Sequence, residues 1–312
     1  MVEKSRSGWN FPVFCVGKKD TTEKRVVYDM RRLNEATLPV DFPIPTIQSL
    51  LDHLSGASIF STIDLKSGFY QVEIEEGSRD YFSFSTRKGK FRMTRLPMGW
   101  KNSSYLFQER LLEVFGDLIY KGVLIYIDDI IIYSSDINEH MDLLLMVLDR
   151  FLDRNLIINL EKSHFLLEQI KYLGHVVDAD GIRPDISKIQ IIHNTRPPEN
   201  ISELKTFLGL VGFYRDYLPR LSEFAAPLWE LDKKDVVWDW SPRHQKAFED
   251  IKNLIGEHTM MTHFDSDLDV GVYSDASDVA ICFIIISQKG QMVMSYHRKL
   301  TDTETRYAVI ER

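Results

Sequence analysis

Cysteine is scarce in this sequence: Cys15 and Cys282 are the only two, and they stand far apart along the chain. This argues against both a disulfide framework and a thiolate zinc site. No uninterrupted apolar run is long enough to span a bilayer, and no signal peptide opens the chain. The absences favour a soluble intracellular protein with no membrane partner.

Positive charge is also in short supply. The net charge of −8 argues, taken alone, against a nucleic-acid partner. Two segments are nevertheless basic: residues 78–101 carry seven Lys or Arg against Asp80 alone, and residues 18–32 carry six against three acids. One such run is typical of a solvated hairpin. Two of them leave local anion binding and a solvated surface equally open.

The order of patterns along the chain predicts a mixed fold. Short β-rich segments with turns fill the first part, including "YQVEI" at 70–74, and an amphipathic helix is predicted over 137–156. Residues 169–185 read as a hairpin turning at "DADG". Proline-separated helices follow "TRPPEN", then three strands from about residue 265, then a last helical segment at 301–312.

The most apolar stretch, "KGVLIYIDDIIIYSS" at 121–135, contains two adjacent carboxylates, Asp128 and Asp129. Two apolar strands around a short polar break predict a hairpin with both aspartates at or beside its turn. An ordinary Asp-rich turn is one interpretation. The segment has no glycine to supply a positive φ, however, and its flanks are strongly apolar. That combination favours carboxylates held rigidly at the edge of a sheet.

Asp64 is a second candidate, because it ends an apolar strand in "STIDLKSGFYQV" just before a glycine-containing turn. On that segment alone, a helix cap or turn aspartate is an equally good interpretation. Together the segments suit nucleotidyl transfer, which needs two divalent cations a few ångströms apart. Magnesium takes hard oxygen ligands, commonly one or two carboxylates plus substrate phosphates.

Six segments, in this order along the chain, resemble the motifs of reverse transcriptases from gypsy-type long-terminal-repeat retrotransposons. They are the fingers strands "FPVFCVGKKDTTEKRVVYDMRRLN", the first catalytic motif "STIDLKSGFYQV", the LPxG…FQ segment "RLPMGWKNSSYLFQ", the YxDD box "YIDD", the primer-grip hairpin "KYLGH" and the following "LKTFLGLVGFYRDYLPRLSEFAAPLWEL". A lone YxDD box would be a weak signal, whereas six ordered motifs covering nearly the whole chain are specific.

The resemblance implies a role for each matching residue. Asp64 and Asp128 match the metal-binding catalytic aspartates, and Asp129 is the third carboxylate of that site. Lys18 and Arg25 match the fingers cations that hold the triphosphate of an incoming dNTP. The implied cofactor is Mg²⁺, with Mn²⁺ as the alternative ion.

Other matches concern the nucleotide and the primer. Phe69 matches the aromatic residue that excludes a ribose 2′-hydroxyl, although an ordinary core aromatic is the alternative interpretation. Met98 and Gly99 would line the dNTP pocket. Many related enzymes have glutamine where Met98 stands, so no polar contact is implied there. Leu173 and Gly174 would position the primer terminus.

The late segment "VYSDASD" resembles the opening of a ribonuclease H domain, in which Asp275 would be the first metal-binding carboxylate. Asp278 reads as a turn residue. Glu311 would be the earlier acid of a pair whose catalytic member falls beyond residue 312. We therefore expect an incomplete nuclease domain and no cleavage of RNA/DNA hybrids by this chain.

The resemblance implies an α+β right-hand polymerase fold of fingers, palm and thumb, followed by an incomplete RNase H-like α/β domain. The expected segments are fingers at about 1–40 and 72–102, palm at about 41–71 and 103–182, a helical thumb at 183–257 and the RNase H-like part at 258–312. The implied activity is RNA-directed DNA polymerisation in retrotransposon replication. Implied partners are RNA or DNA template-primer, dNTPs and other parts of the Pol polyprotein, in cytoplasmic virus-like particles. The competing hypothesis is an inactive or domesticated fragment that binds nucleic acid or a protein.

Overall fold

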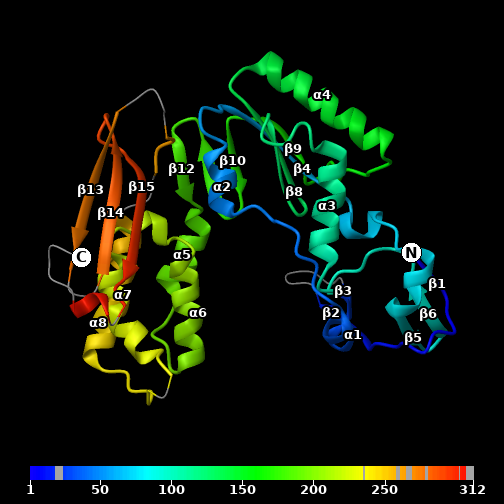
Figure 1. Ribbon diagram of the computed structural model, residues 1–312, viewed down its shortest axis with the longest axis horizontal. Coiled ribbons are helices and arrows are strands. Elements are labelled where there is room, and N and C mark those ends of the chain that lie inside the picture. Colours follow the sequence, from blue (N-terminus) through cyan, green and yellow to red (C-terminus); the bar gives the residue numbers. More distant parts are fainter. Residues whose placement is uncertain are drawn as a thin grey trace. The chain divides into compact units, whose positions relative to one another are not determined.

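The structure is a computed structural model. It describes residues 1–17, 24–234, 236–257, 261–264, 269–277, 280–301 and 303–306, with only the backbone of Arg25 and Glu257. The chain forms two compact units, whose elements are labelled in Figure 1. Unit 1 comprises residues 1–50 and 58–168, and unit 2 comprises residues 51–57 and 169–312.

A four-stranded antiparallel sheet is the centre of unit 1. Its strands, in spatial order, are β7 (Val123–Tyr126), β8 (Asp129–Ser134), β4 (Ile59–Asp64) and β9 (His164–Leu167). Successive side chains of a strand point to opposite faces, and both faces of the middle strands are buried here. Ile130, Ile131 and Ile132 of β8 are all at most 1% exposed. This explains why the segment reads as a continuous apolar run instead of an alternating one.

Two helices, α3 (Ser103–Phe115) and α4 (Ile137–Asp153), pack on the sheet and against each other (Figure 1). Their apolar side chains join those of the strands in one core. Phe115 of α3 meets Phe151 of α4 edge-to-face, with ring centroids 5.0 Å apart. Asp136 caps α4 by accepting hydrogen bonds from the backbone N–H groups of Asn138 and Glu139.

The buried His140 of α4 connects the helix to two strands. Its Nε2 lies 2.7 Å from the Ser61 hydroxyl of β4, and its Nδ1 lies 3.0 Å from the Ser134 hydroxyl of β8. The Ser61 hydroxyl also accepts the backbone N–H of Leu166 in β9. Burial lowers the pKa of His140, so the imidazole stays neutral at physiological pH and serves as both donor and acceptor.

The rest of unit 1 is β-rich. One sheet has the order β1 (Val2–Lys4), β6 (Gly89–Met93), β5 (Ser83–Thr86), and β2 (Val13–Gly17) pairs with β3 (Lys24–Tyr28). The short helices are α1 (Arg31–Ala36), α2 (Ile47–Asp52, whose last residues belong to unit 2), η1 (Gly68–Gln71) and η2 (Glu76–Phe82).

The prediction of a strand at 70–74 is wrong. Residues 68–71 form the 3₁₀ helix η1 instead, and only Glu73 makes a bridge, to Arg95.

Unit 2 begins with the antiparallel meander β10 (Gln169–Tyr172), β11 (His175–Asp178) and β12 (Gly181–Pro184). The turn predicted at "DADG" is confirmed, and Asp178 accepts the N–H groups of Asp180 and Gly181. Helices α5 (Ile186–Asn194), α6 (Ile201–Gly212), α7 (Leu221–Leu231) and α8 (Pro242–Glu257) follow, with η3 (Arg215–Tyr217) between α6 and α7.

Three strands, β13 (Val270–Ala276), β14 (Ala280–Ser287) and β15 (Met292–Lys299), form the last sheet of unit 2. The buried Ser222 of α7 and His297 of β15 lie 2.5 Å apart through Oγ and Nδ1 and connect this sheet to the helices. The helix expected at 301–312 is described only as the 3₁₀ turn η4 (Glu304–Arg306). In the described part of the chain, no helix combines the length and the apolar character needed to cross a membrane.

Candidate active site

The β7–β8 hairpin holds the adjacent aspartates. Tyr126 ends β7 and pairs with Asp129, the first residue of β8, so Ile127 and Asp128 form the turn. Ile127 has φ of 58°, in the left-handed region that costs an L-residue roughly 1–2 kcal/mol. A β-branched residue occupies the position where such turns commonly have glycine. The turn therefore needs support from outside the hairpin.

Gln108 of α3 supplies that support. Its side-chain oxygen accepts the backbone N–H of Ile127 at 2.6 Å, and its side-chain nitrogen donates to the carbonyl of Ile125 at 3.1 Å. The Gln108 side chain is 1% exposed. The amide side chain donates through its nitrogen and accepts through its oxygen, and the two bonds fix the backbone on both sides of Tyr126.

Asp64, the last residue of β4, stands directly opposite Asp129 in the antiparallel ladder. Directly opposed residues project from the same face of a sheet, with Cβ atoms about 5 Å apart. Residues just before β9, on the side of β4 away from β8, hold the backbone of Asp64. Its N–H donates to the Ser163 hydroxyl at 3.1 Å, and its carbonyl accepts the N–H of Asn159 at 2.8 Å. The structure thus brings Asp64, Asp128 and Asp129 to one end of the central sheet.

The three carboxylates repel one another. Asp128 and Asp129 are exposed and Asp64 is half-buried. Asp129 is partly exposed to solvent. Desolvation of its carboxylate by the surrounding protein raises its pKa to about 6, and the charges of Asp128 and Asp64 contribute to the shift. Of the ion pairs between described side chains, none includes any of the three. The cluster therefore has an uncompensated negative charge, the condition under which a bound cation is most favourable.

The donor set suits a hard cation that is shared with a substrate. Within the described ranges, no three His, Cys, Asp or Glu side chains converge closely enough to enclose a metal ion. Magnesium is commonly held by only one or two carboxylates, with water and substrate phosphates completing its coordination. Asp64, Asp128 and Asp129 fit that mode of binding.

Phe69 lies in η1, five residues beyond Asp64. Its ring is half-buried and stacks on the buried Phe107 of α3, with centroids 4.9 Å apart and 29° between the planes. The close packing extends to the preceding residue, because a Cβ on Gly68 would lie 2.9 Å from the Phe107 ring. Phe107 thus supports one face of the Phe69 ring, while part of the ring remains exposed.

Met98 and Gly99 line a cavity of about 970 Å³ in unit 1, whose other wall residues include Val27, Tyr28 and Tyr70. Burial, and the adjacent Tyr70 to which it is hydrogen-bonded, raise the pKa of Tyr28 to about 12. The cavity is bordered mainly by apolar and aromatic groups. Its lining does not include Phe69 or the three aspartates.

The two predicted fingers cations are only partly visible. Lys18 lies outside the described residues. Arg25 is on β3, opposite Val16 of β2, and its backbone alone is described. The structure therefore places the strand that carries Arg25 but not the cationic groups.

Most basic side chains of the run at 78–101 form ion pairs or hydrogen bonds within unit 1. Arg92 pairs with Glu3 and Asp80, both at 2.8 Å, and Arg95 pairs with Glu73 at 2.8 Å. Other members bond to backbone carbonyls: Arg79 to Ile74, Lys90 to Ser7 and Lys101 to Thr37. Arg87 and Lys88 lie exposed around the β5–β6 turn. Five of the seven basic side chains of this run thus bind groups within unit 1.

Leu173 and Gly174 form the β10–β11 turn of unit 2, with φ of 46° and 81°. A Cβ on Gly174 would lie 3.1 Å from the ring of Phe213, so only glycine fits against that ring without movement. The Tyr214 hydroxyl donates to the Gly174 carbonyl at 3.1 Å, and His175 stacks on Phe213. Aromatic side chains from the end of α6 and the start of η3 thus hold this turn.

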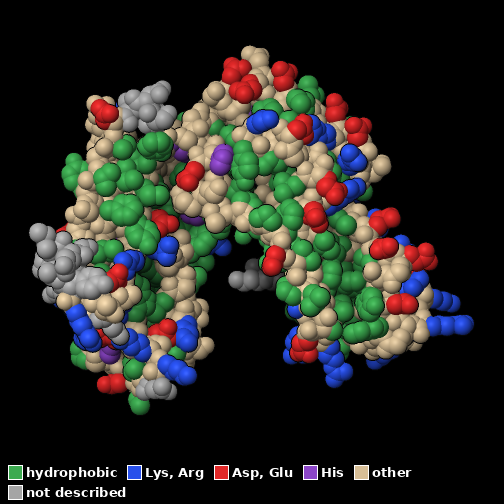
Figure 2. Space-filling model, viewed as in Figure 1, with side chains coloured by type: hydrophobic (Ala, Val, Ile, Leu, Met, Phe, Trp, Pro, Cys, Tyr) green, Lys and Arg blue, Asp and Glu red, His purple; other side chains and the backbone are tan. Residues whose placement is uncertain are grey.

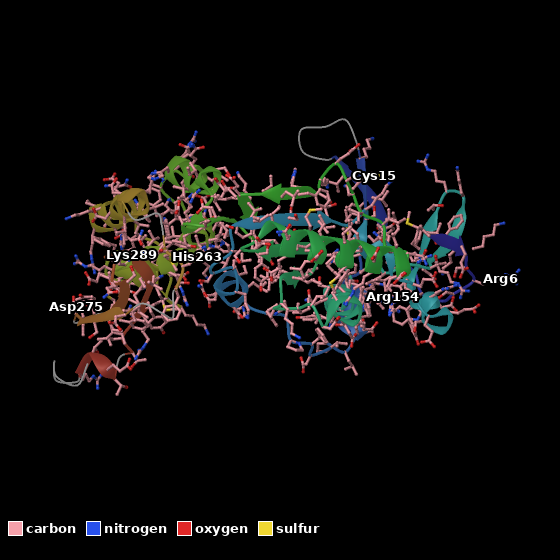
Figure 3. The ribbon with its side chains drawn as sticks, turned by 90° about the horizontal axis from the view of Figure 1, so that it is seen from above. Arg6, Cys15, Arg154, His263, Asp275 and Lys289 are labelled. Carbon is pink, nitrogen blue, oxygen red and sulfur yellow. The ribbon has the colours of Figure 1, made fainter. Side chains whose placement is uncertain are left out.

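Asp275 lies exposed on β13 of unit 2, opposite Cys282 of β14 (Figure 3). Arg220, just before α7, pairs with Glu223 at 2.7 Å. Glu223, and more weakly Asp275, raise the pKa of Arg220. Asp278 and Glu311 lie outside the described residues.

Several supporting residues were not singled out by the sequence. Gln108 belongs to the "FQ" motif, which marks its position but not its two backbone contacts. Ser163 lies in no motif, and Phe213 lies in the sixth segment without a role implied for it; the partners of both are distant in sequence, and only the folded chain brings them together.

Comparison with known proteins gives a consistent result. A family model described as "Reverse transcriptase (RNA-dependent DNA polymerase)" matches residues 16–177, and one described as "RNase H-like domain found in reverse transcriptase" matches residues 240–312. The retrovirus-related Pol polyprotein from transposon 297 of Drosophila melanogaster is 34% identical over 317 residues, covering 100% of this chain and 30% of that protein. The Drosophila gypsy Pol polyprotein is 32% identical over 329 residues, again covering 100% of this chain and 32% of that protein.

The Tf2-3 polyprotein of Schizosaccharomyces pombe is 32% identical over 306 residues, covering 96% of this chain and 23% of that protein. The chain thus spans about a third or less of the curated relatives it matches. A foamy viral protease-reverse transcriptase dRH in complex with ds DNA has a TM-score of 0.89 and 26% identity, covering 99% of this chain and 55% of that one. The foamy viral enzyme in complex with RNA/DNA hybrid gives a TM-score of 0.84 at the same identity, with coverage of 99% and 42%. The expected α+β architecture is confirmed.

Replacing Gln108 by leucine removes both backbone contacts at nearly constant size. We expect a loss of about 1–3 kcal/mol in the free energy of unfolding, because the partly buried N–H of Ile127 and the buried carbonyl of Ile125 lose their partner. Hydrogen exchange at the Ile127 amide should also accelerate. Urea denaturation and exchange mass spectrometry measure the two effects. Unchanged exchange at Ile127 would show that Gln108 does not hold the turn.

Asp129→Asn removes one of three like charges. The folded-state pKa of about 6 lies above the ordinary 3.8, so ionisation of Asp129 opposes folding increasingly between those two pH values and fully above them. We expect the variant to be more stable than the parent chain at about pH 8, with the difference shrinking as the pH falls toward about 4. Urea midpoints across this range test it, with the exposed Asp142→Asn as control. A variant less stable than its parent at the higher pH contradicts the prediction.

Proposed function

The chain belongs to the reverse transcriptase family, and we propose that it is the RNA-directed DNA polymerase segment of a gypsy-type long-terminal-repeat retrotransposon Pol polyprotein. The observation that carries this proposal is the placement of Asp64 opposite Asp129, with Asp128 in the adjoining turn. Carboxylates from neighbouring strands at one end of a sheet give a rigid binding site for cations and leave one side open to a substrate.

The proposed reaction is nucleotidyl transfer. The 3′-hydroxyl of a primer loses its proton to solvent and attacks the α-phosphate of a dNTP, the new phosphodiester bond forms as the bond to the β-phosphate breaks, and pyrophosphate leaves. Two bound Mg²⁺ ions, or Mn²⁺ in their place, would supply Lewis acidity at the attacking and leaving oxygens. Asp64 and Asp128 are proposed as the carboxylates that hold them, with Asp129 as the third. Gln108 positions Asp128 by fixing the backbone on both sides of Tyr126.

Other residues are proposed to bind and select the dNTP. Phe69 is proposed to lie beneath the sugar of the dNTP, where a rigid ring leaves no room for a 2′-hydroxyl. Its support is the stacking on Phe107. Met98 and Gly99 are proposed to line the nucleotide pocket, together with Tyr28 and Tyr70. Lys18 and Arg25 are proposed to hold the triphosphate.

Template-primer is the proposed macromolecular partner, since the similar foamy viral enzymes form complexes with ds DNA and with RNA/DNA hybrid. Leu173 and Gly174 are proposed to position the primer end, and the support is their firmly held turn. Because most of the basic run at 78–101 is engaged within unit 1, electrostatic contacts with phosphate would depend on residues such as Arg87 and Lys88. Such contacts make affinity fall as salt rises.

Primer extension on an RNA template tests the polymerase activity. We expect dNTP incorporation by the full chain with Mg²⁺, and a loss of at least about a hundredfold in Asp128→Asn, the scale for removing one electrostatic contact to a transition state. Asp149→Asn, on the exposed face of α4, should extend normally. Equal activity in Asp128→Asn and the parent would refute the assignment. Hybrid binding with no incorporation under Mg²⁺ or Mn²⁺ would favour the inactive-fragment hypothesis.

Phe69→Val tests the role of the ring in sugar selection. We expect discrimination against ribonucleotides to fall by about tenfold or more, while dNTP incorporation persists. Phe69→Tyr retains the ring and should keep the discrimination. Single-nucleotide incorporation kinetics with dNTP and rNTP measure both. If Phe69→Val loses the two activities equally, the ring serves core packing alone.

A further inference from the structure

Helix α4 is apolar over more of its circumference than its contact with the sheet requires. Its buried side consists of His140, Leu143, Leu144, Val147 and Phe151. Next to that side, Met141, Leu145 and Leu152 are 39%, 55% and 75% exposed, and the half-buried Leu148 lies between them. Large apolar side chains thus continue from the core onto the outer surface of the helix.

The spacing of these four residues is specific. Met141, Leu145, Leu148 and Leu152 are separated by four, three and four residues, which is the a/d spacing of a heptad repeat. We call them the α4 seam. On an α-helix they form one continuous stripe, about two heptads long, that a second helix can pack against with knobs-into-holes geometry. Exposed apolar stripes of this kind mark interaction sites.

Acidic side chains border the seam on its outer side. Asp142 and Asp149 follow seam residues by one position, at heptad position e, and Asp153 extends the row; all three are exposed. Figure 2 shows acidic side chains gathered over α4, with apolar ones among them. On the opposite border stand Leu144 and Phe151, which are buried against the sheet. The seam therefore has a single charged border, and its sign is negative.

This charge distribution disfavours a second copy as the occupant. An antiparallel pair of α4 helices would place e positions of the two copies side by side, so that Asp142 faces Asp149 of the other copy. Like charges at such positions are destabilising. A parallel pair would set these carboxylates beside the apolar g positions, without a cation.

We propose that the α4 seam is a docking site for an amphipathic helix of a partner protein, with leucine-type residues at its a and d positions and Lys or Arg beside them. Burial of Met141, Leu145 and Leu152 supplies the apolar contact, and the cations of the partner face Asp142 and Asp149. The site is independent of the proposed polymerase chemistry, since it uses the outer surface of α4.

A designed helical peptide of about 20 residues, with leucine at a and d and lysine at e and g, serves as the probe. Its matched control has glutamate at e and g. Fluorescence anisotropy with the full chain should show binding of the lysine peptide at least about tenfold tighter than that of the glutamate peptide, and this binding should weaken with salt. In the double variant Asp142→Lys, Asp149→Lys the preference should reverse.

Leu145→Ser should reduce the binding of the lysine peptide by at least about tenfold. Met146→Ser, an exposed position of α4 outside the seam, should leave the binding unchanged; circular dichroism checks that both variants fold. Equal binding of the two peptides, or equal loss in both variants, would overturn the proposal. Light scattering that shows a dimer of the chain, lost in Leu145→Ser, would assign the seam to a second copy and overturn it as well.

Discussion

Repulsion between Asp64 and Asp129 is the constraint on which unit 1 is organised. Directly opposed like charges destabilise a pair of strands, so these strands must be held together by other interactions. The apolar core beneath α3 and α4 does this, with Ile130, Ile131 and Ile132 almost fully buried. The His140 network adds directional contacts from α4 to β4 and β8. Stability is thus concentrated next to the group of charges that opposes it, a distribution common at functional sites.

The sequence predicts the apolar hairpin and its two aspartates because the relevant signals are local. A run of β-branched residues, interrupted by Asp128 and Asp129 without glycine, is sufficient to predict strands and a constrained turn. It does not show which residue adopts the left-handed conformation. Ile127 does so because Gln108, nineteen positions earlier, satisfies the backbone on either side, and no local pattern encodes that contact.

The basic run at 78–101 shows a second limit. Its composition left phosphate binding and a solvated surface open, whereas Arg92 and Arg95 pair with acids of the same unit. Glu3 is far away in sequence, so its pairing with Arg92 follows from the β1–β6 register and not from local charge. The 3₁₀ helix at 68–71 in place of the predicted strand has a similar cause. There Phe69 stacks on Phe107, a residue distant in sequence, and local β propensity does not anticipate such a contact.

Strand β4 also has a consequence for how the chain folds. It lies between β8 and β9, both of which are synthesised much later. Pairing over such sequence separations is slow, because the entropy of closing a long loop opposes it before native contacts form. During synthesis β4 therefore leaves the ribosome with both edges unpaired and with apolar residues that have no core. An unpaired apolar strand is a site of aggregation, and the emerging chain is a natural client for chaperones until residues 129–134 and 164–167 have both been synthesised.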